Sequence, residues 1–103
     1  MNLKGTLPAL VLQVLERGPL HGYAIAQEIK GRSKGVLDFK GGTLYPALHA
    51  LENKGHLASY EQTENGRVRR YYKLTLAGHQ ALEAEREHWR ELSAAVRLVM
   101  EGA

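Results

Sequence analysis

The sequence contains no cysteine, and this absence removes several kinds of chemistry. Without thiols the chain has no disulfide, no thiol nucleophile and no cysteine-based zinc site. The composition fits a reducing cytoplasm, and we expect a cytoplasmic protein. No run of about 18 apolar residues is present, so we expect no membrane-spanning helix. Gln13 and Glu16 interrupt the first apolar run, which is therefore not typical of a signal peptide.

Patterns that indicate catalysis or metal binding are also scarce. No two of the five histidines have the i, i+4 spacing of a helical metal site. Gly41-Gly42-Thr43 lacks the spacing and the lysine of a phosphate-binding loop. His88 with Glu85 or Glu91 can in principle bind zinc, but a solvated helix face is the preferred interpretation. We therefore expect no enzyme, no metal and no cofactor.

What is present is a short, mildly basic chain whose charge is unevenly distributed. Its 103 residues suit one domain, and the net charge is +3. Residues 40–75 hold six Lys and Arg against three Glu, net +3, whereas residues 76–103 hold three Arg against five Glu, net −2. The basic middle of the chain is the candidate surface for a phosphate backbone.

Apolar residues at spacings of three and four predict three short helices and one long helix. The first follows Thr6, a possible N-cap, and ends at Gly18-Pro19; the second starts at His21-Gly22 and ends between Gly31 and Gly35. The third starts near Gly41-Gly42-Thr43, with Pro46 expected in its first turn, and ends at Gly55. The last is capped by Thr75 and runs to about Met100.

A β-hairpin is predicted between the third and the last helix. The segments Leu57–Glu64 and Arg67–Thr75 flank Asn65-Gly66, the strongest short signal for a hairpin turn. The predicted fold is therefore mainly α with a small β-hairpin, a winged helix-turn-helix over residues 1–75. Residues 76–103 form a long C-terminal dimerisation helix in this interpretation.

Two groups of residues are candidates for DNA contact. Thr43, Tyr45, Pro46 and His49 lie at the start of the third helix, with Lys40 just before it, where a recognition helix meets the major groove. Arg67, Arg69, Arg70 and Lys73 lie on the second hairpin strand and can contact phosphates or a minor groove. Tyr45 and Pro46 can equally serve packing and helix initiation. The strand cations can equally protect an exposed sheet edge, whereas Tyr72 and Leu74 are interpreted as core.

The last helix carries a heptad seam. Leu82, Trp89 and Val96 are seven residues apart, as are Leu92 and Val99, and Glu85 interrupts the pattern. The seam is predicted to bury itself against a second copy of the chain, although it can also fold back on its own domain. Trp89 is either a plain interface anchor or a stacking wall for an aromatic effector. Glu85 can face such a cavity and attract a cation, or it can be exposed.

Three motifs in this order resemble the PadR family of transcriptional regulators. They are GPLHGY over Gly18–Tyr23, GGTLYPALHALENKGHL over Gly41–Leu57, and RRYYKLTLAG over Arg69–Gly78. The resemblance implies a dimeric repressor of a roughly palindromic operator, with a single C-terminal dimerisation helix. It supports Thr43, Tyr45 and Pro46 as matching positions. In several multidrug-sensing relatives, flat aromatic compounds enter the dimer interface near a tryptophan of the last helix, and Trp89 lies on the matching helix.

The sequence thus indicates a regulator that recognises double-stranded DNA as a homodimer and represses transcription. A small aromatic effector that releases it is part of this hypothesis. The alternatives are a winged helix that binds proteins and a DNA-binding protein without sequence preference. The cations from Arg67 to Lys73 argue against the first, because a protein-binding module does not need them.

Overall fold

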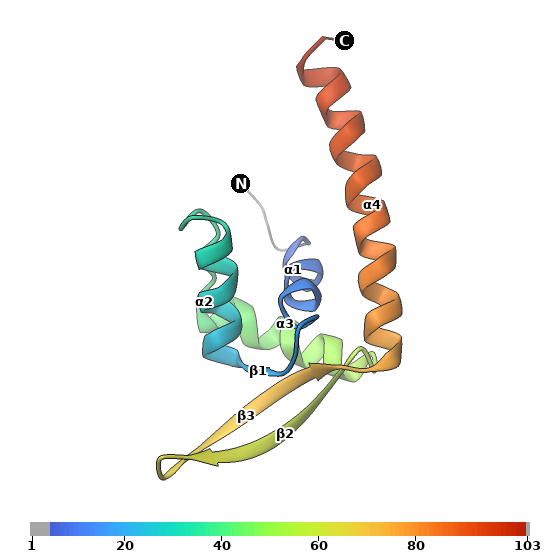
Figure 1. Cartoon of the computed structure of the whole chain (residues 1–103). Coiled ribbons are helices and arrows are strands. Elements are labelled where there is room, and N and C mark those ends of the chain that lie inside the picture. Colours follow the sequence, from blue (N-terminus) through green and yellow to red (C-terminus); the bar gives the residue numbers. More distant parts are fainter. Residues whose placement is uncertain (1–4, 103) are drawn as a thin grey trace.

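Within residues 5–102, which the computed structural model describes, the chain folds into four helices and a three-stranded antiparallel sheet (Figure 1). The elements are α1 (Leu7–Val14), β1 (Leu20–His21), α2 (Gly22–Arg32), α3 (Gly41–Asn53), β2 (Leu57–Glu64), β3 (Arg67–Leu74) and α4 (Leu76–Met100). The predicted fold class and the order of three helices, hairpin and long last helix are confirmed. One short strand, β1, is additional.

The sheet has β3 in its centre, between β1 and β2. At the hairpin turn Asn65 and Gly66 have φ values of 49° and 78°, the positive angles that a type I′ turn requires. The Asn-Gly prediction is therefore confirmed. β1 pairs Leu20 with Tyr72, far along the chain. A strand of two residues has no alternating pattern, so β1 was not predictable from sequence.

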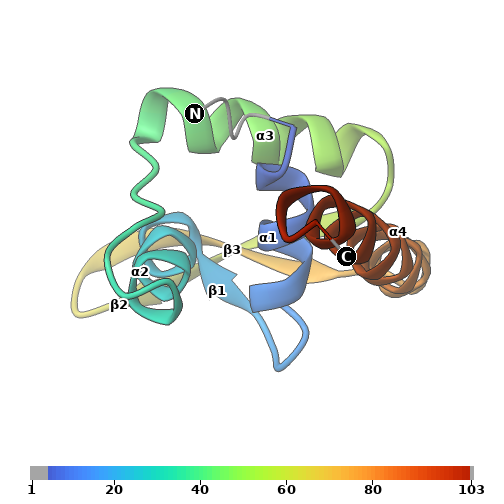
Figure 2. The same cartoon turned by 90° about the horizontal axis from the view of Figure 1, so that it is seen from above.

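A single core fills the space between the helices and one face of the sheet. Figure 2 shows α1 at the centre of the molecule, and α1 contacts α2, α3 and α4. Tyr72 supplies the sheet's largest buried side chain and is 1% exposed, which confirms its assignment to the core. The core side chains are Leu7, Val11, Leu12, Val14, Leu15, Ile25, Ile29, Leu44, Leu48, Leu51, Leu57, Tyr72 and Leu82.

The helix starts agree with the sequence in two places and differ in two. Thr75 caps α4, since its Oγ1 accepts a hydrogen bond from the Gly78 N–H at 3.0 Å. His21 caps α2 through Nδ1, which accepts from the Ala24 N–H at 3.2 Å. Thr6 stands at the start of α1, but its side chain makes no capping bond. Pro46 is the sixth residue of α3 and lies inside the helix, beyond the first turn where it was expected.

The long helix α4 is held to the body only by its first turns. Arg86 anchors it: Nε donates to the side-chain Oε1 of Gln13 in α1 at 3.0 Å, and Nη2 donates to the Glu16 carboxylate at 2.7 Å. The Arg86 guanidinium, mainly through this hydrogen bond, lowers the pKa of Glu16. Beyond this anchor α4 projects away from the other helices (Figure 1). The molecule is consequently elongated, 56 × 29 × 22 Å.

Gly78 allows the close approach of α4 to the end of α3. A Cβ atom at this position would lie 2.0 Å from the His56 carbonyl oxygen, a backbone atom that cannot rotate away. We expect Gly78→Ala to lower the free energy of unfolding by about 3 kcal/mol through overpacking, measured by urea denaturation. Gly31→Ala is the matched control, because nothing lies within 4 Å of its added Cβ. Equal stability of the two variants would contradict this account of Gly78.

Candidate nucleic-acid interface

The exposed side of α3 carries most of the residues predicted for the recognition helix. Burial of Leu44 and Leu48 turns the opposite side to solvent, where Thr43, Pro46 and His49 lie. Their spacing of three residues places them in one stripe along the helix. Lys40 precedes the first turn of α3 and is largely exposed, with Nζ 3.4 Å from the Asp38 carboxylate. The exposed side of α3 therefore presents a hydroxyl and an imidazole, with a cation just before the first turn.

Tyr45 differs from its neighbours, because its ring is packed as well as partly exposed. The ring lies against Gly22 at the start of α2 and against Gly41 at the start of α3. The side chain is nevertheless 42% exposed. Both interpretations of Tyr45, packing and surface contact, are thus compatible with its position.

The hairpin arranges its cations on both faces, as the alternation predicted, but two of them already have anionic partners. Arg69 Nε lies 3.7 Å from the Glu64 carboxylate. Arg70 lies 3.8 Å from the Glu61 carboxylate and donates to Ser59 Oγ at 3.0 Å. These acids come from β2, where Glu61 lies directly opposite Arg70 and Glu64 lies opposite Arg67 and diagonal to Arg69, so the sequence of β3 alone did not reveal them.

Arg67 and Lys73 are the uncommitted cations of the hairpin. Among the ion pairs formed within residues 5–102, neither takes part, and both side chains are exposed. Lys73 Nζ lies 6.0 Å from the centre of the Tyr60 ring, a weak cation–π arrangement. The hairpin therefore offers fewer free positive charges than the sequence indicates.

An aromatic cluster on the outer face of the sheet was not anticipated. The rings of Tyr60 and Tyr71 stack with their centres 5.6 Å apart, and His21 meets the Tyr71 ring edge-on at 5.5 Å. The Tyr71 hydroxyl donates to Glu64, and this bond raises the pKa of Tyr71. These contacts join three strands, so only the register of the sheet discloses them. They stiffen the base of the hairpin.

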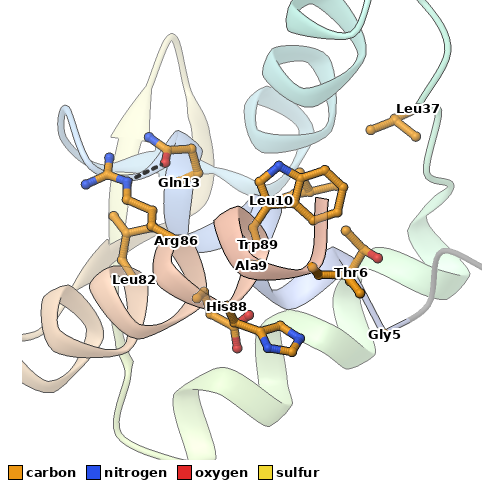
Figure 3. A pocket seen from close by; sticks show the side chains of 12 residues that line it. Gly5, Thr6, Ala9, Leu10, Gln13, Leu37, Leu82, Arg86, His88 and Trp89 are labelled. Carbon is orange, nitrogen blue, oxygen red and sulfur yellow. Dashed lines mark hydrogen bonds between the residues drawn. The ribbon is translucent and has the colours of Figure 1, made fainter. Parts of the chain in front are cut away.

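A groove of about 690 Å³ lies on the other side of the molecule, between α1 and α4 (Figure 3). Leu10 and Ala9 of α1 and Trp89 and Leu92 of α4 form its apolar lining, and Leu37 of the α2–α3 connection closes one end. Glu85 and Arg86 add charged groups to the same lining. Trp89 is 59% exposed. Its ring is the largest apolar surface that this groove leaves uncovered.

Leu82 corrects one prediction for the heptad seam. It was expected to face a partner, but it is 2% exposed and packs in the core of its own chain. The reason is that the first turns of α4 lie on α1, so the apolar stripe changes its role along the helix. Trp89, Leu92, Val96 and Val99, the later seam residues, are all exposed.

The segment Gly31–Gly35 matches the G-x-S-x-G pattern of serine hydrolases, with Ser33 in the centre. Ser33, however, caps the C-terminal end of α2: its hydroxyl donates to the Lys30 carbonyl and accepts from the Leu37 N–H. In residues 5–102 no three His, Asp or Glu side chains gather closely enough to hold a metal ion. No described helix is both long and apolar enough to cross a membrane.

Comparisons with known proteins agree with the three sequence motifs. The family model of PadR-like transcriptional regulators matches residues 11–84. The transcriptional regulator Rv3488 of Mycobacterium tuberculosis is 40% identical over 77 residues, which are 75% of this chain and 69% of that protein.

Two crystal structures show the same fold. A PadR family transcription regulator from Clostridium difficile R20291 is 32% identical with a TM-score of 0.83, over 93% of this chain and 99% of that chain. Bacillus subtilis PadR in complex with operator DNA is 26% identical with a TM-score of 0.70, over 77% of this chain and 45% of that chain. The chain is thus, as its motifs predicted, a member of the PadR-like family of transcriptional regulators and not an enzyme.

Proposed function

We propose that this protein is a homodimeric repressor that binds a specific double-stranded DNA operator through α3 and the β2–β3 hairpin. The observation that carries the proposal is the exposed stripe of Thr43, Pro46 and His49 along one side of α3. Bacillus subtilis PadR, which has a similar fold, has been seen with its operator. Residues 1–75 serve DNA binding in this proposal and residues 76–103 serve dimerisation, with Leu82 completing the DNA-binding core.

The residues divide into base readers and phosphate contacts. Thr43 and His49 have short polar side chains that can reach base edges. Lys40, Arg67 and Lys73 have exposed cationic groups suited to phosphates. Arg69 and Arg70 can contact phosphates only if they give up their ion pairs with Glu64 and Glu61.

The first experiment measures binding to the DNA upstream of the protein's own gene and to a scrambled duplex, at low and physiological salt. We expect a complex of two chains per duplex that favours the native sequence by about a thousandfold. A reporter gene behind that DNA should lose expression when the protein is supplied. Equal, salt-sensitive binding to both duplexes would indicate a DNA binder without sequence preference. No binding at low salt would point to a protein-binding winged helix instead.

Variants then separate the two kinds of contact in the same assay. Arg67→Ala should weaken binding to both duplexes and reduce the slope of log K against log salt by about one. His49→Ala should weaken the native duplex by about tenfold and the scrambled one much less. Arg97→Ala is the matched control, since this exposed cation lies near the far end of α4. A salt slope unchanged in Arg67→Ala would remove that residue from the interface.

We propose that two chains associate through the part of α4 beyond Arg86. Trp89, Leu92, Val96 and Val99 share one side of the helix and are exposed in the single chain, at a spacing that suits a partner helix. An apolar stripe of this length on a domain of about 100 residues needs a cover, because the core has no further area to offer it.

Charge placed on this stripe should separate the subunits. We expect Val96→Glu to weaken the dimer by about a hundredfold, since it would bury an unpaired carboxylate. Leu98→Glu is the matched control: Leu98 is similarly exposed on the same helix but lies off the heptad positions. Sedimentation equilibrium at micromolar concentration measures both. A Val96→Glu variant that remains dimeric would place the interface elsewhere.

We propose further that the groove at Trp89 admits a flat aromatic effector, with Glu85 favouring a cationic one. Saturable quenching of the fluorescence of Trp89, the single tryptophan, should report binding of such compounds. The same compounds should weaken operator binding at least tenfold, and Glu85→Gln should reduce the preference for cations. Quenching that leaves operator affinity unchanged would argue against a regulatory role.

A further inference from the structure

The ring of Tyr45 occupies the space in which a side chain of residue 22 would stand. Gly22 is the first residue of α2 and is buried. A Cβ atom built on it would lie 2.6 Å from Tyr45 Oη, 2.7 Å from Cε1 and 2.8 Å from Cζ. Real Cβ atoms do not approach other atoms this closely. Any other residue at position 22 would therefore have to displace the tyrosine ring.

The backbone gives no separate reason for a glycine at position 22. Gly22 does not have the left-handed φ that Gly18 and Gly35 adopt. Within a helix, glycine is also less favourable than alanine. The contact with Tyr45 is thus the physical reason for a glycine here.

Tyr45 stands at the place where α3 meets α2. Its ring also contacts Gly41, whose added Cβ would lie 3.5 Å from Cδ2, an ordinary van der Waals distance. Lys40, at the start of α3, makes no capping bond with its side chain. Buried Leu44 and the packed ring of Tyr45 therefore do most to hold this end of α3.

We propose that Gly22 is a positioning residue for DNA binding, because it forms the socket for Tyr45 and the socket sets where α3 stands relative to α2. This inference rests on the proposed function. In this proposal, displacement of the tyrosine ring is passed on to α3, whose Thr43 and Pro46 lie on the exposed stripe. Gly22 itself needs no contact with DNA.

A double-mutant cycle of Gly22→Ala and Tyr45→Ala tests the socket. Alone, Gly22→Ala should weaken operator binding by about tenfold and lower the midpoint of thermal unfolding. In the Tyr45→Ala background the ring is absent, so Gly22→Ala should leave operator binding unchanged. There it should also raise the unfolding midpoint, because alanine favours the helix. The sign of its effect on stability is therefore expected to reverse.

Tyr45→Phe distinguishes the ring from the hydroxyl. It removes Oη, but Cε1 and Cζ remain 2.7 and 2.8 Å from the added Cβ. Gly22→Ala should therefore remain harmful in the Tyr45→Phe background. If removal of the hydroxyl alone restores binding, the socket does not hold the ring as proposed.

Two glycine variants serve as controls. Gly31→Ala, in the same helix with nothing within 4 Å, should leave operator affinity unchanged. Gly41→Ala, which touches the same ring at an ordinary distance, should not lower the unfolding midpoint.

The outcomes separate the socket from the function on which it rests. If the wild-type protein binds no operator, the proposed function fails, and the role of Gly22 in DNA binding fails with it. If the wild type binds and Gly22→Ala has the same effect in both backgrounds, only the socket is overturned. If Gly22→Ala does not fold alone but folds and binds as well as Tyr45→Ala in the double variant, the rescue supports the socket.

Discussion

Burial of α1 is the constraint on which the rest of this structure depends. The helix lies among α2, α3 and α4, and its apolar side chains from Leu7 to Leu15 supply much of the core. In a chain of 103 residues this one core uses nearly all the apolar area that can be covered internally. The turn end of the β2–β3 hairpin and the second half of α4 therefore project from the body (Figure 1). These two projections, and the stripe on α3, are the surfaces left for other molecules.

Glycines, which have no side chain, set the spacing of the elements as much as the packed side chains do. Gly78 lets α4 begin directly against the His56 carbonyl, and Gly22 gives space to the Tyr45 ring. Each glycine costs something in helix propensity. In return, two elements approach to a distance that no other residue allows. At Gly78 the close neighbour is a backbone carbonyl, which does not yield, whereas at Gly22 it is the side-chain ring of Tyr45.

Much of this architecture could be predicted from sequence, because its signals are local. Helical spacing located the four helices, and Asn65-Gly66 located the hairpin turn. The missed features all depend on pairing between distant segments: β1, the Arg70–Glu61 contact and the aromatic contacts of Tyr71. A heptad pattern likewise shows that Leu82 is buried but not by which chain. Pro46 was expected in the first turn from the usual preference of proline, but it lies at the sixth position of α3.

The charges of the candidate site could be predicted only in part, for a related reason. Between Arg67 and Arg70, β3 carries three arginines and no acidic residue. The antiparallel register, however, brings Glu61 and Glu64 of β2 close to them. Those acids hold Arg69 and Arg70 in place before any DNA arrives. The helix α3 and its exposed side were easier to predict, since they depend on one continuous segment.

This partial neutralisation connects DNA binding with dimerisation. In the proposed complex, one protomer would offer Arg67, Lys73 and the lightly paired Lys40, which are exposed, as its phosphate contacts. About three such contacts give only weak, non-specific binding at physiological salt. Joining two protomers makes the second half-site contact intramolecular, which raises affinity without a new contact. In the proposed dimer, a ligand that shifts α4 at the groove therefore changes the distance and angle between the two α3 helices. Because each half-site binds weakly alone, operator affinity depends strongly on whether both helices can bind at once.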